Sequence, residues 1–139
     1  MAVKWLFGCH EPYTNGPVPT GVAVEDAVPY VGQRVAELQQ AFPGKPIVIA
    51  ETGWPSAGEQ HQGAIPSLAG EAYFIRSFLA YAASHHYDYY LLEAFDQPWK
   101  AASPEGAVGA AWGLFDAARH PKFRLKGPLP VDGMGLVGQ

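Results

Sequence analysis

The stretch PIVIAETGWPS, residues 46–56, runs four apolar residues directly into Glu51 and reaches Trp54 three residues later. A continuous β-branched run of this kind is typical of a strand that is buried on both faces of a parallel sheet. We therefore expect a strand that ends at Glu51. In parallel α/β folds the functional groups gather at the carboxyl ends of the strands, so Glu51 is a candidate site residue.

Amphipathic segments flank this strand on both sides. Apolar residues recur at steps of three and four across residues 24–42 and again across residues 68–82, which predicts two helices. Residues 2–9 and 87–95 are apolar, strand-like runs. The order strand, helix, strand, helix, strand predicts an α/β fold with parallel strands.

The carboxyl-terminal part of the chain has a weaker pattern. After residue 100 we expect only a short strand or hairpin near residues 112–116. Residues 127–139 are typical of a linker or a disordered tail. A chain of 139 residues that is 48% hydrophobic suits one modest domain with a real core. We therefore expect a single domain over residues 1–126, followed by the tail.

The amino-acid composition limits which binding partners and which cellular location we expect. Nine Lys and Arg against thirteen Asp and Glu give a net charge of −4, so there is no basic field to attract nucleic acid or anionic lipid. The single Cys excludes an intrachain disulfide, and we see neither a signal peptide nor a segment of the roughly 20 apolar residues that a membrane helix needs. As it stands the sequence favours a cytoplasmic protein; a secreted or periplasmic one is expected if a leader or an N-terminal half was removed.

Polar and aromatic side chains follow each of the three predicted strands. They are His10, Glu11 and Tyr13 after the first, Glu51 and Trp54 after the second, and Glu93, Asp96, Trp99 and Lys100 after the third. Aromatic faces stack on sugar rings, and paired carboxylates cleave glycosidic bonds. The combination predicts a carbohydrate site. We expect no metal, because no second His or Cys stands at a ligand-like spacing from His10.

Each of these residues also has a structural interpretation. Glu51 could be an ion-pair partner or a cap for the following turn, and Glu93 could be a core carboxylate paired to Lys100 or Arg76. Trp54 and the second loop tryptophan, Trp99, could fill the core. Each lies close to a Pro within a loop, which makes a surface platform for a ligand equally reasonable.

Three motifs together resemble glycoside hydrolase family 17, and most closely its bacterial β-glucan hydrolase and glucanosyltransferase branch. They are GKPIVIAETGWPS (residues 44–56), YYLLEAFDQPWK (residues 89–100) and GAVGAAWGLFDAARHPKF (residues 106–123). The resemblance implies an eight-stranded (β/α) TIM barrel and a retaining mechanism on β-linked glucosides, commonly β-1,3-glucans, with no cofactor.

The resemblance also implies roles for particular residues. Glu51 matches the family's nucleophile, at the end of its seventh strand. Glu93 and Lys100 match polar site residues after the eighth strand, and Tyr13 falls where the family has a site tyrosine. Trp54 and Trp99 would flank the glucose ring. We also assign His10 and Asp96 to substrate binding.

The chain departs from the family at the general acid/base. The family carries that residue on an Asn-Glu pair after its fourth strand, whereas no Asn-Glu pair occurs in this sequence, which resembles only the last three strands of the barrel. Glu93, or less favourably Glu11, would then have to act as the acid.

Three parallel strands with two helices leave sheet edges and one sheet surface uncovered, so we expect a partial, half-barrel-like domain that is completed by self-association into a homodimer or a higher oligomer. The leading hypothesis is a retaining β-glucosidase or β-1,3-glucanase, or a transglycosylase. The alternatives are a barrel remnant that binds β-glucan without turnover and a fragment of a longer enzyme.

Overall fold

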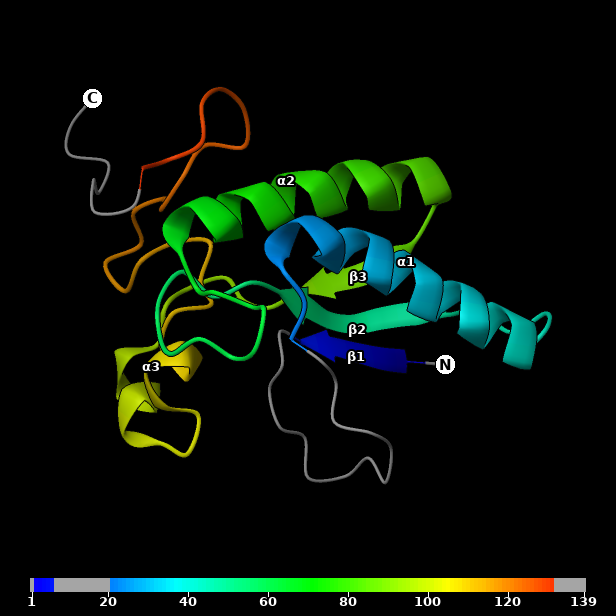
Figure 1. The fold of residues 1–139 in the computed structure, drawn as a ribbon, viewed down its shortest axis with the longest axis horizontal. Coiled ribbons are helices and arrows are strands. Elements are labelled where there is room, and N and C mark those ends of the chain that lie inside the picture. Colours follow the sequence, from blue (N-terminus) through cyan, green and yellow to red (C-terminus); the bar gives the residue numbers. More distant parts are fainter. Residues whose placement is uncertain (1, 7–20, 132–139) are drawn as a thin grey trace.

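The structure is a computed structural model that describes residues 2–6 and 21–131 (Figure 1). Three parallel strands form its sheet, in the order β1 (Ala2–Leu6), β2 (Val48–Gly53) and β3 (Asp88–Leu91). The central strand pairs with both neighbours. The predicted α/β class and the parallel direction of the strands are confirmed.

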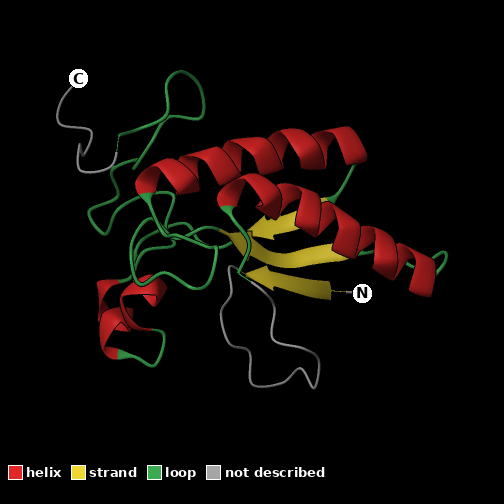
Figure 2. Cartoon of the chain, in the orientation of Figure 1, coloured by secondary structure: helices red, strands yellow, loops and turns green. Residues whose placement is uncertain are grey.

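Two long helices cover one face of the sheet (Figure 2). They are α1 (Val24–Ala41) and α2 (Leu68–His85). Ser67 caps α2, because its hydroxyl accepts a hydrogen bond of 2.9 Å from the backbone N–H of Gly70. His86 ends the same helix in a left-handed conformation, with a φ of 55°. Both helices lie where the apolar periodicity predicts them.

The core lies between these helices and the sheet. Phe78 of α2 is fully buried, and its ring meets that of Tyr89 from β3 edge to face at 5.0 Å between centroids. Phe74 stacks on Phe78 at 5.8 Å and on Trp54 at 6.0 Å. The aromatic row therefore ties α2 to the end of β2 and to β3.

The segment after β3 differs from the prediction of a short strand or hairpin near residues 112–116. It contains a 3-10 helix, η1 (Pro98–Ala102), and a single helical turn, α3 (Gly106–Gly109). Phe115 makes isolated bridges to Phe95 and Pro121 rather than belonging to a strand. Runs of Gly and Ala provide no apolar period here, so long-range backbone hydrogen bonds decide the conformation.

The predicted tail is partly described. The side chain of Arg76 in α2 donates hydrogen bonds to the backbone oxygens of Arg124 and Gly127, at 2.9 and 2.8 Å. The first residues of the tail therefore pack against α2. No helix in the described residues, 2–6 and 21–131, is long and apolar enough to cross a membrane.

Candidate functional site

Glu51 lies inside β2 and not at its end. The strand continues to Gly53, two residues beyond the predicted end, because Leu6 of β1 pairs with Gly53 and the oxygen of Thr52 accepts a 2.8 Å hydrogen bond from the backbone N–H of Leu92. Thr52 is fully buried, whereas Glu51 is half-buried. Glu51 pairs with Lys4 of β1, at a point where the register of both ladders shifts, and the next residue, Thr52, pairs with both neighbouring strands. Glu51 thus lies near the carboxyl end of the central strand, where parallel α/β folds place their functional groups.

Gly53 explains how the next segment can lie so close. A Cβ atom at this position would stand 2.1 Å from the backbone oxygen of Leu92, a separation that no side chain tolerates. Only glycine allows the chain after β3 to pass directly beside β2. This contact brings Glu93, the residue after Leu92, next to the strand that carries Glu51.

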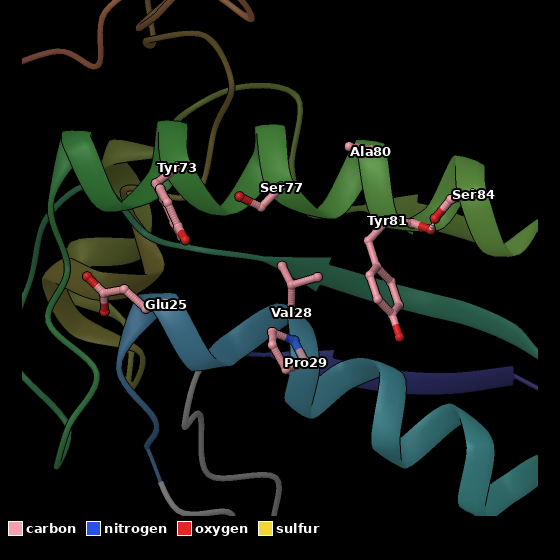
Figure 3. Close-up of a pocket in the computed structure, with 8 residues that line it drawn as sticks. All are labelled: Glu25, Val28, Pro29, Tyr73, Ser77, Ala80, Tyr81 and Ser84. Atoms are coloured by element: carbon pink, nitrogen blue, oxygen red, sulfur yellow. Dashed lines mark hydrogen bonds between the residues drawn. The ribbon is translucent and has the colours of Figure 1, made fainter.

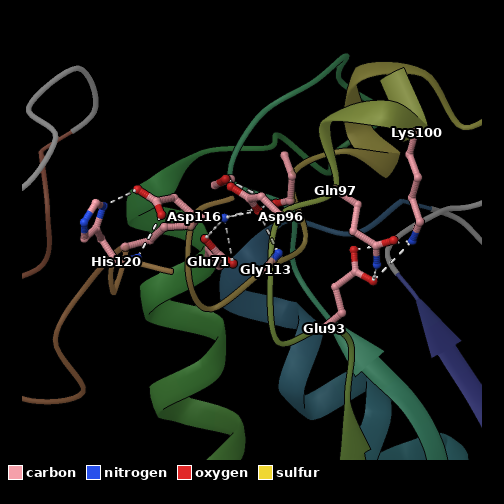
Figure 4. Close-up of polar contacts among 11 residues, drawn as sticks. Glu71, Glu93, Asp96, Gln97, Lys100, Gly113, Asp116 and His120 are labelled. Atoms are coloured by element: carbon pink, nitrogen blue, oxygen red, sulfur yellow. Dashed lines mark hydrogen bonds and ion pairs between the residues drawn. The ribbon is translucent and has the colours of Figure 1, made fainter. Parts of the chain in front are cut away.

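Glu93 makes the polar contacts shown in Figure 4. Lys100 Nζ lies 3.2 Å from Glu93 Oε2 and 3.4 Å from Oε1, and the side-chain amide of Gln97 donates to the same carboxylate. The side chains of Glu93 and Lys100 are only 12% and 15% exposed. Of the two partners foreseen for Glu93, the structure selects Lys100, while Arg76 binds backbone oxygens elsewhere.

Asp96 lies in a second polar cluster. Its Oδ1 accepts hydrogen bonds from Lys122 Nζ at 2.9 Å and from the backbone N–H of Gly113 at 2.8 Å (Figure 4). Lys122 also pairs with Glu71 of α2 at 3.0 Å. These contacts occupy Oδ1 of Asp96 with groups of the protein. The assignment of Asp96 to substrate binding stays a prediction.

Glu71 carries a perturbed pKa. Its side chain has no exposed surface, and this burial raises its pKa to about 8, although the charge and the hydrogen bond of Lys122 act in the opposite direction. The nearby charge of Asp96 raises it further. The sequence gives no sign of this cluster, because Glu71 reads as an ordinary acidic residue in the first turn of a helix and Lys122 as a loop lysine.

The two tryptophans expected at the rim have different environments. Trp54 is 2% exposed, stacks on Phe74 and donates its indole N–H to the backbone oxygen of Ile65 at 3.3 Å. The prediction of a sugar platform at Trp54 is therefore wrong: its ring belongs to the core, because the loop after β2 folds back onto α2. Trp99 is 68% exposed on η1, with Lys100 Nζ 5.8 Å from the centre of its ring. It remains available to stack on a ligand.

The remaining candidates, His10, Glu11 and Tyr13, lie outside the described residues. Within the described part of the chain, no group of three or more His, Cys, Asp or Glu side chains could hold a metal ion.

A hollow of about 410 Å³ lies elsewhere, between α1 and α2 (Figure 3). It is lined by Glu25, Val28, Pro29, Tyr73, Ser77, Ala80, Tyr81 and Ser84. Among the described residues, none of the candidate site residues contributes to it, so it is separate from Glu51 and Glu93 at the carboxyl end of the sheet.

Comparison with known proteins connects this geometry to a family. A family model described as the BtgE/BtgC glycoside hydrolase domain matches residues 11–113. The chain is similar to a probable family 17 glucosidase, SCW10, of Saccharomyces cerevisiae, with 35% identity over 96 residues. This match covers 68% of the chain but 24% of that relative, so the chain spans about a quarter of the relative's length.

Solved structures agree with the sequence comparison. The chain aligns with the glycoside hydrolase family 17 β-1,3-glucanosyltransferase of Rhizomucor miehei at a TM-score of 0.67 and 30% identity, covering 73% of this chain and 36% of that one. An active-site mutant of the R. miehei β-1,3-glucanosyltransferase in complex with laminaritriose aligns equally well, at a TM-score of 0.67. The resemblance seen in the three motifs is confirmed, and the chain belongs to the BtgE/BtgC glycoside hydrolase domain family, within glycoside hydrolase family 17.

Proposed function

We propose that this chain acts on β-linked glucosides or β-1,3-glucans by a retaining mechanism, with Glu51 as the nucleophile. The observation that carries the proposal is the position of Glu51 near the end of the central strand, one residue from the backbone contact that brings in Glu93, in a chain that belongs to this family. The relatives are a probable glucosidase and a β-1,3-glucanosyltransferase, which supports this substrate class.

In this mechanism the Glu51 carboxylate attacks the anomeric carbon and forms a glycosyl ester while the leaving oxygen takes a proton from an acid. A base then removes a proton from water or from an acceptor sugar hydroxyl, which attacks the same carbon and releases Glu51. Water gives hydrolysis and a sugar gives transglycosylation. Retention requires the two carboxyl groups to lie about 5 Å apart.

Glu93 is our first candidate for the acid/base, and Glu11 is the weaker one. Both oxygens of Glu93 are already engaged by Lys100 and Gln97. To act as an acid, Glu93 must hold a proton in place of one of these contacts, so proton donation should be the slow part of the reaction. Substrates whose leaving group needs little protonation, such as aryl β-glucosides, should therefore react best.

We propose further that the three strands are part of a (β/α)8 barrel that self-association completes. The two long helices lie on one face of the sheet, and among the described strands β1 and β3 each have one neighbour only. Tyr90 of β3 is 69% exposed. Light scattering on the purified chain should give a dimer or a higher oligomer, and Tyr90→Asp should shift it toward monomer. A wild-type chain that is monomeric and still turns over substrate would contradict the proposed self-association.

Glu51→Ala with added azide is the decisive experiment for the nucleophile. Azide that replaces the Glu51 carboxylate attacks the sugar directly and gives the α-glucosyl azide, whereas azide that rescues a missing acid/base attacks the glycosyl ester and gives the β-glucosyl azide. Glu93→Ala and Glu11→Ala are treated in the same way. Glu37→Gln, which changes an exposed glutamate of α1, is the matched control.

We expect the α-azide from the Glu51 variant and the β-azide from one of the other two. Full turnover by Glu51→Ala would contradict the nucleophile assignment. A second candidate function is a remnant that binds β-glucan without turnover; it is favoured by the occupied oxygens of Glu93 and by the exposed ring of Trp99. It would be supported if laminaritriose binds to the wild-type chain and no aryl glucoside is cleaved.

A further inference from the structure

Lys122 joins three segments that lie far apart in the sequence. Its ammonium group lies 3.0 Å from Glu71 of α2, 2.9 Å from Asp96 and 3.3 Å from the backbone oxygen of Ala111. The side chain of Lys122 is only 9% exposed. A buried ammonium group is stable only where it is paired, so these contacts hold the lysine in one place.

The segments that Lys122 contacts also carry the candidate catalytic groups. The backbone N–H of Glu93 donates to the oxygen of Trp112 at 3.0 Å, and the backbone N–H of Leu114 donates back to the oxygen of Glu93 at 3.0 Å. Asp96 binds the backbone N–H of Gly113 with the same oxygen that accepts from Lys122. Backbone hydrogen bonds therefore join residues 93–97 and 110–115 into one unit, which we call the laced unit. The side chain of Lys122 links this unit to Glu71 of α2.

We propose that Lys122 is a positioning residue for the site: by pairing with Asp96 and Glu71, it fixes the laced unit, and with it Glu93 and Lys100, relative to the sheet that carries Glu51. The catalytic consequence rests on the function proposed above. The structural consequence, that Lys122 holds residues 93–97 against α2, does not depend on that function.

The proposal follows from what the loss of the cation would do. Without Lys122 the buried carboxyl group of Glu71 and the carboxylate of Asp96 would lose the cationic donor that they share, and nothing in this cluster would join Asp96 to α2. The laced unit would then move away from α2 while keeping its own backbone hydrogen bonds. A displacement of about 1 Å at a catalytic group can cost on the order of 100-fold in rate, so Glu93 would lose efficiency without being altered itself.

The test compares Lys122→Met/Glu71→Gln with the wild-type chain by hydrogen exchange and by turnover of an aryl β-glucoside. The second substitution replaces the buried acid that would be left without its cationic partner, so that the variant keeps its fold. Lys122→Arg is the conservative variant, because a guanidinium group can pair with both carboxylates. Lys45→Met, at an exposed position in the turn before β2, controls for the loss of a lysine.

In the double variant we expect exchange in residues 93–97 and 110–115 to rise at least tenfold, exchange in α1 to stay unchanged, and kcat to fall ten- to 100-fold with little change in KM. In Lys122→Arg we expect both the exchange rates in these two segments and kcat to stay close to the wild-type values. Unchanged exchange in these two segments overturns the proposal, as does faster exchange throughout the chain, which would show a purely structural role. Faster local exchange with an unchanged kcat also overturns it. If the wild-type chain shows no turnover, the proposed function fails, and exchange alone decides whether Lys122 fastens the unit.

Discussion

The buried carboxyl of Glu71 predicts that stability falls as the pH rises through neutrality. In the folded chain its pKa is about 8, against an ordinary value of 4.5. Between these two values the folded protein holds a proton that the unfolded chain has released, so every increase in pH favours unfolding. The contribution is fully present below about pH 4.5 and is lost above about pH 8.

The magnitude follows from the same two values. One pH unit within the window costs about 1.4 kcal/mol for a single proton. Between pH 6 and pH 8 the free energy of unfolding should fall by about 2 kcal/mol. This is less than two full units, because Glu71 in the folded chain begins to lose its own proton as the pH approaches 8. Glu71→Gln keeps a neutral group of the same shape and cannot ionise, so it should remove this loss.

The assay is urea denaturation of both proteins at pH 6 and pH 8. We expect the free energy of unfolding of Glu71→Gln, relative to the wild-type chain, to rise by about 2 kcal/mol between the two pH values. All other ionisable groups are the same in both proteins, so most of their effect cancels in this difference. Glu59→Gln, at an exposed position, controls for the change in net charge. A difference that stays constant from pH 6 to pH 8 would refute the reasoning, since it would mean that Glu71 does not change its protonation there.

Three further predictions concern packing and the site. Phe78→Ala empties a fully buried position and should lower the free energy of unfolding by about 3–5 kcal/mol in urea denaturation; a loss below about 1 kcal/mol would contradict the packing described here. Ser67→Ala removes the cap that accepts from Gly70 and should cost about 1 kcal/mol in the same assay, whereas Ser67→Asp should retain most of the stability. Trp99→Ala should change stability by less than about 0.5 kcal/mol and weaken the binding of laminaritriose in calorimetric titration; unchanged affinity would exclude stacking by this ring.

The sequence predicts the helices and strands well because local signals coincide there. The apolar periodicity starts at Val24 and Leu68, where the structure begins both helices, and Ser67 offers a hydroxyl at the capping position. The end of β2 is misplaced by two residues, because its last pairs depend on Leu6 and Leu92, which are remote in the chain. The pairing of Glu93 with Lys100 could be foreseen as one of two alternatives, and geometry selects it.

The contacts that escape prediction are those decided by distant segments. Trp54 lies beside a Pro after a strand, which suits a surface ring, yet the loop that follows returns to α2 and buries it against Phe74. Lys122 and Glu71 are separated by 51 positions and meet only because the laced unit packs on the helix. No pattern of charge or hydropathy within either segment indicates this meeting.

The two carboxylates of the proposed site therefore depend on different kinds of structure. Glu51 belongs to β2, where it pairs with Lys4 of β1 and is followed by Thr52, which pairs with both neighbouring strands, so we expect its position to survive changes in the surrounding loops. Glu93 follows β3 in an irregular segment whose place is set by backbone hydrogen bonds to residues 112–114 and, through Asp96, by Lys122. A perturbation of the loops should thus impair proton transfer before nucleophilic attack. In such variants the loss of rate should be larger for glucosides with poor leaving groups than for activated aryl glucosides, because only the former depend strongly on the acid.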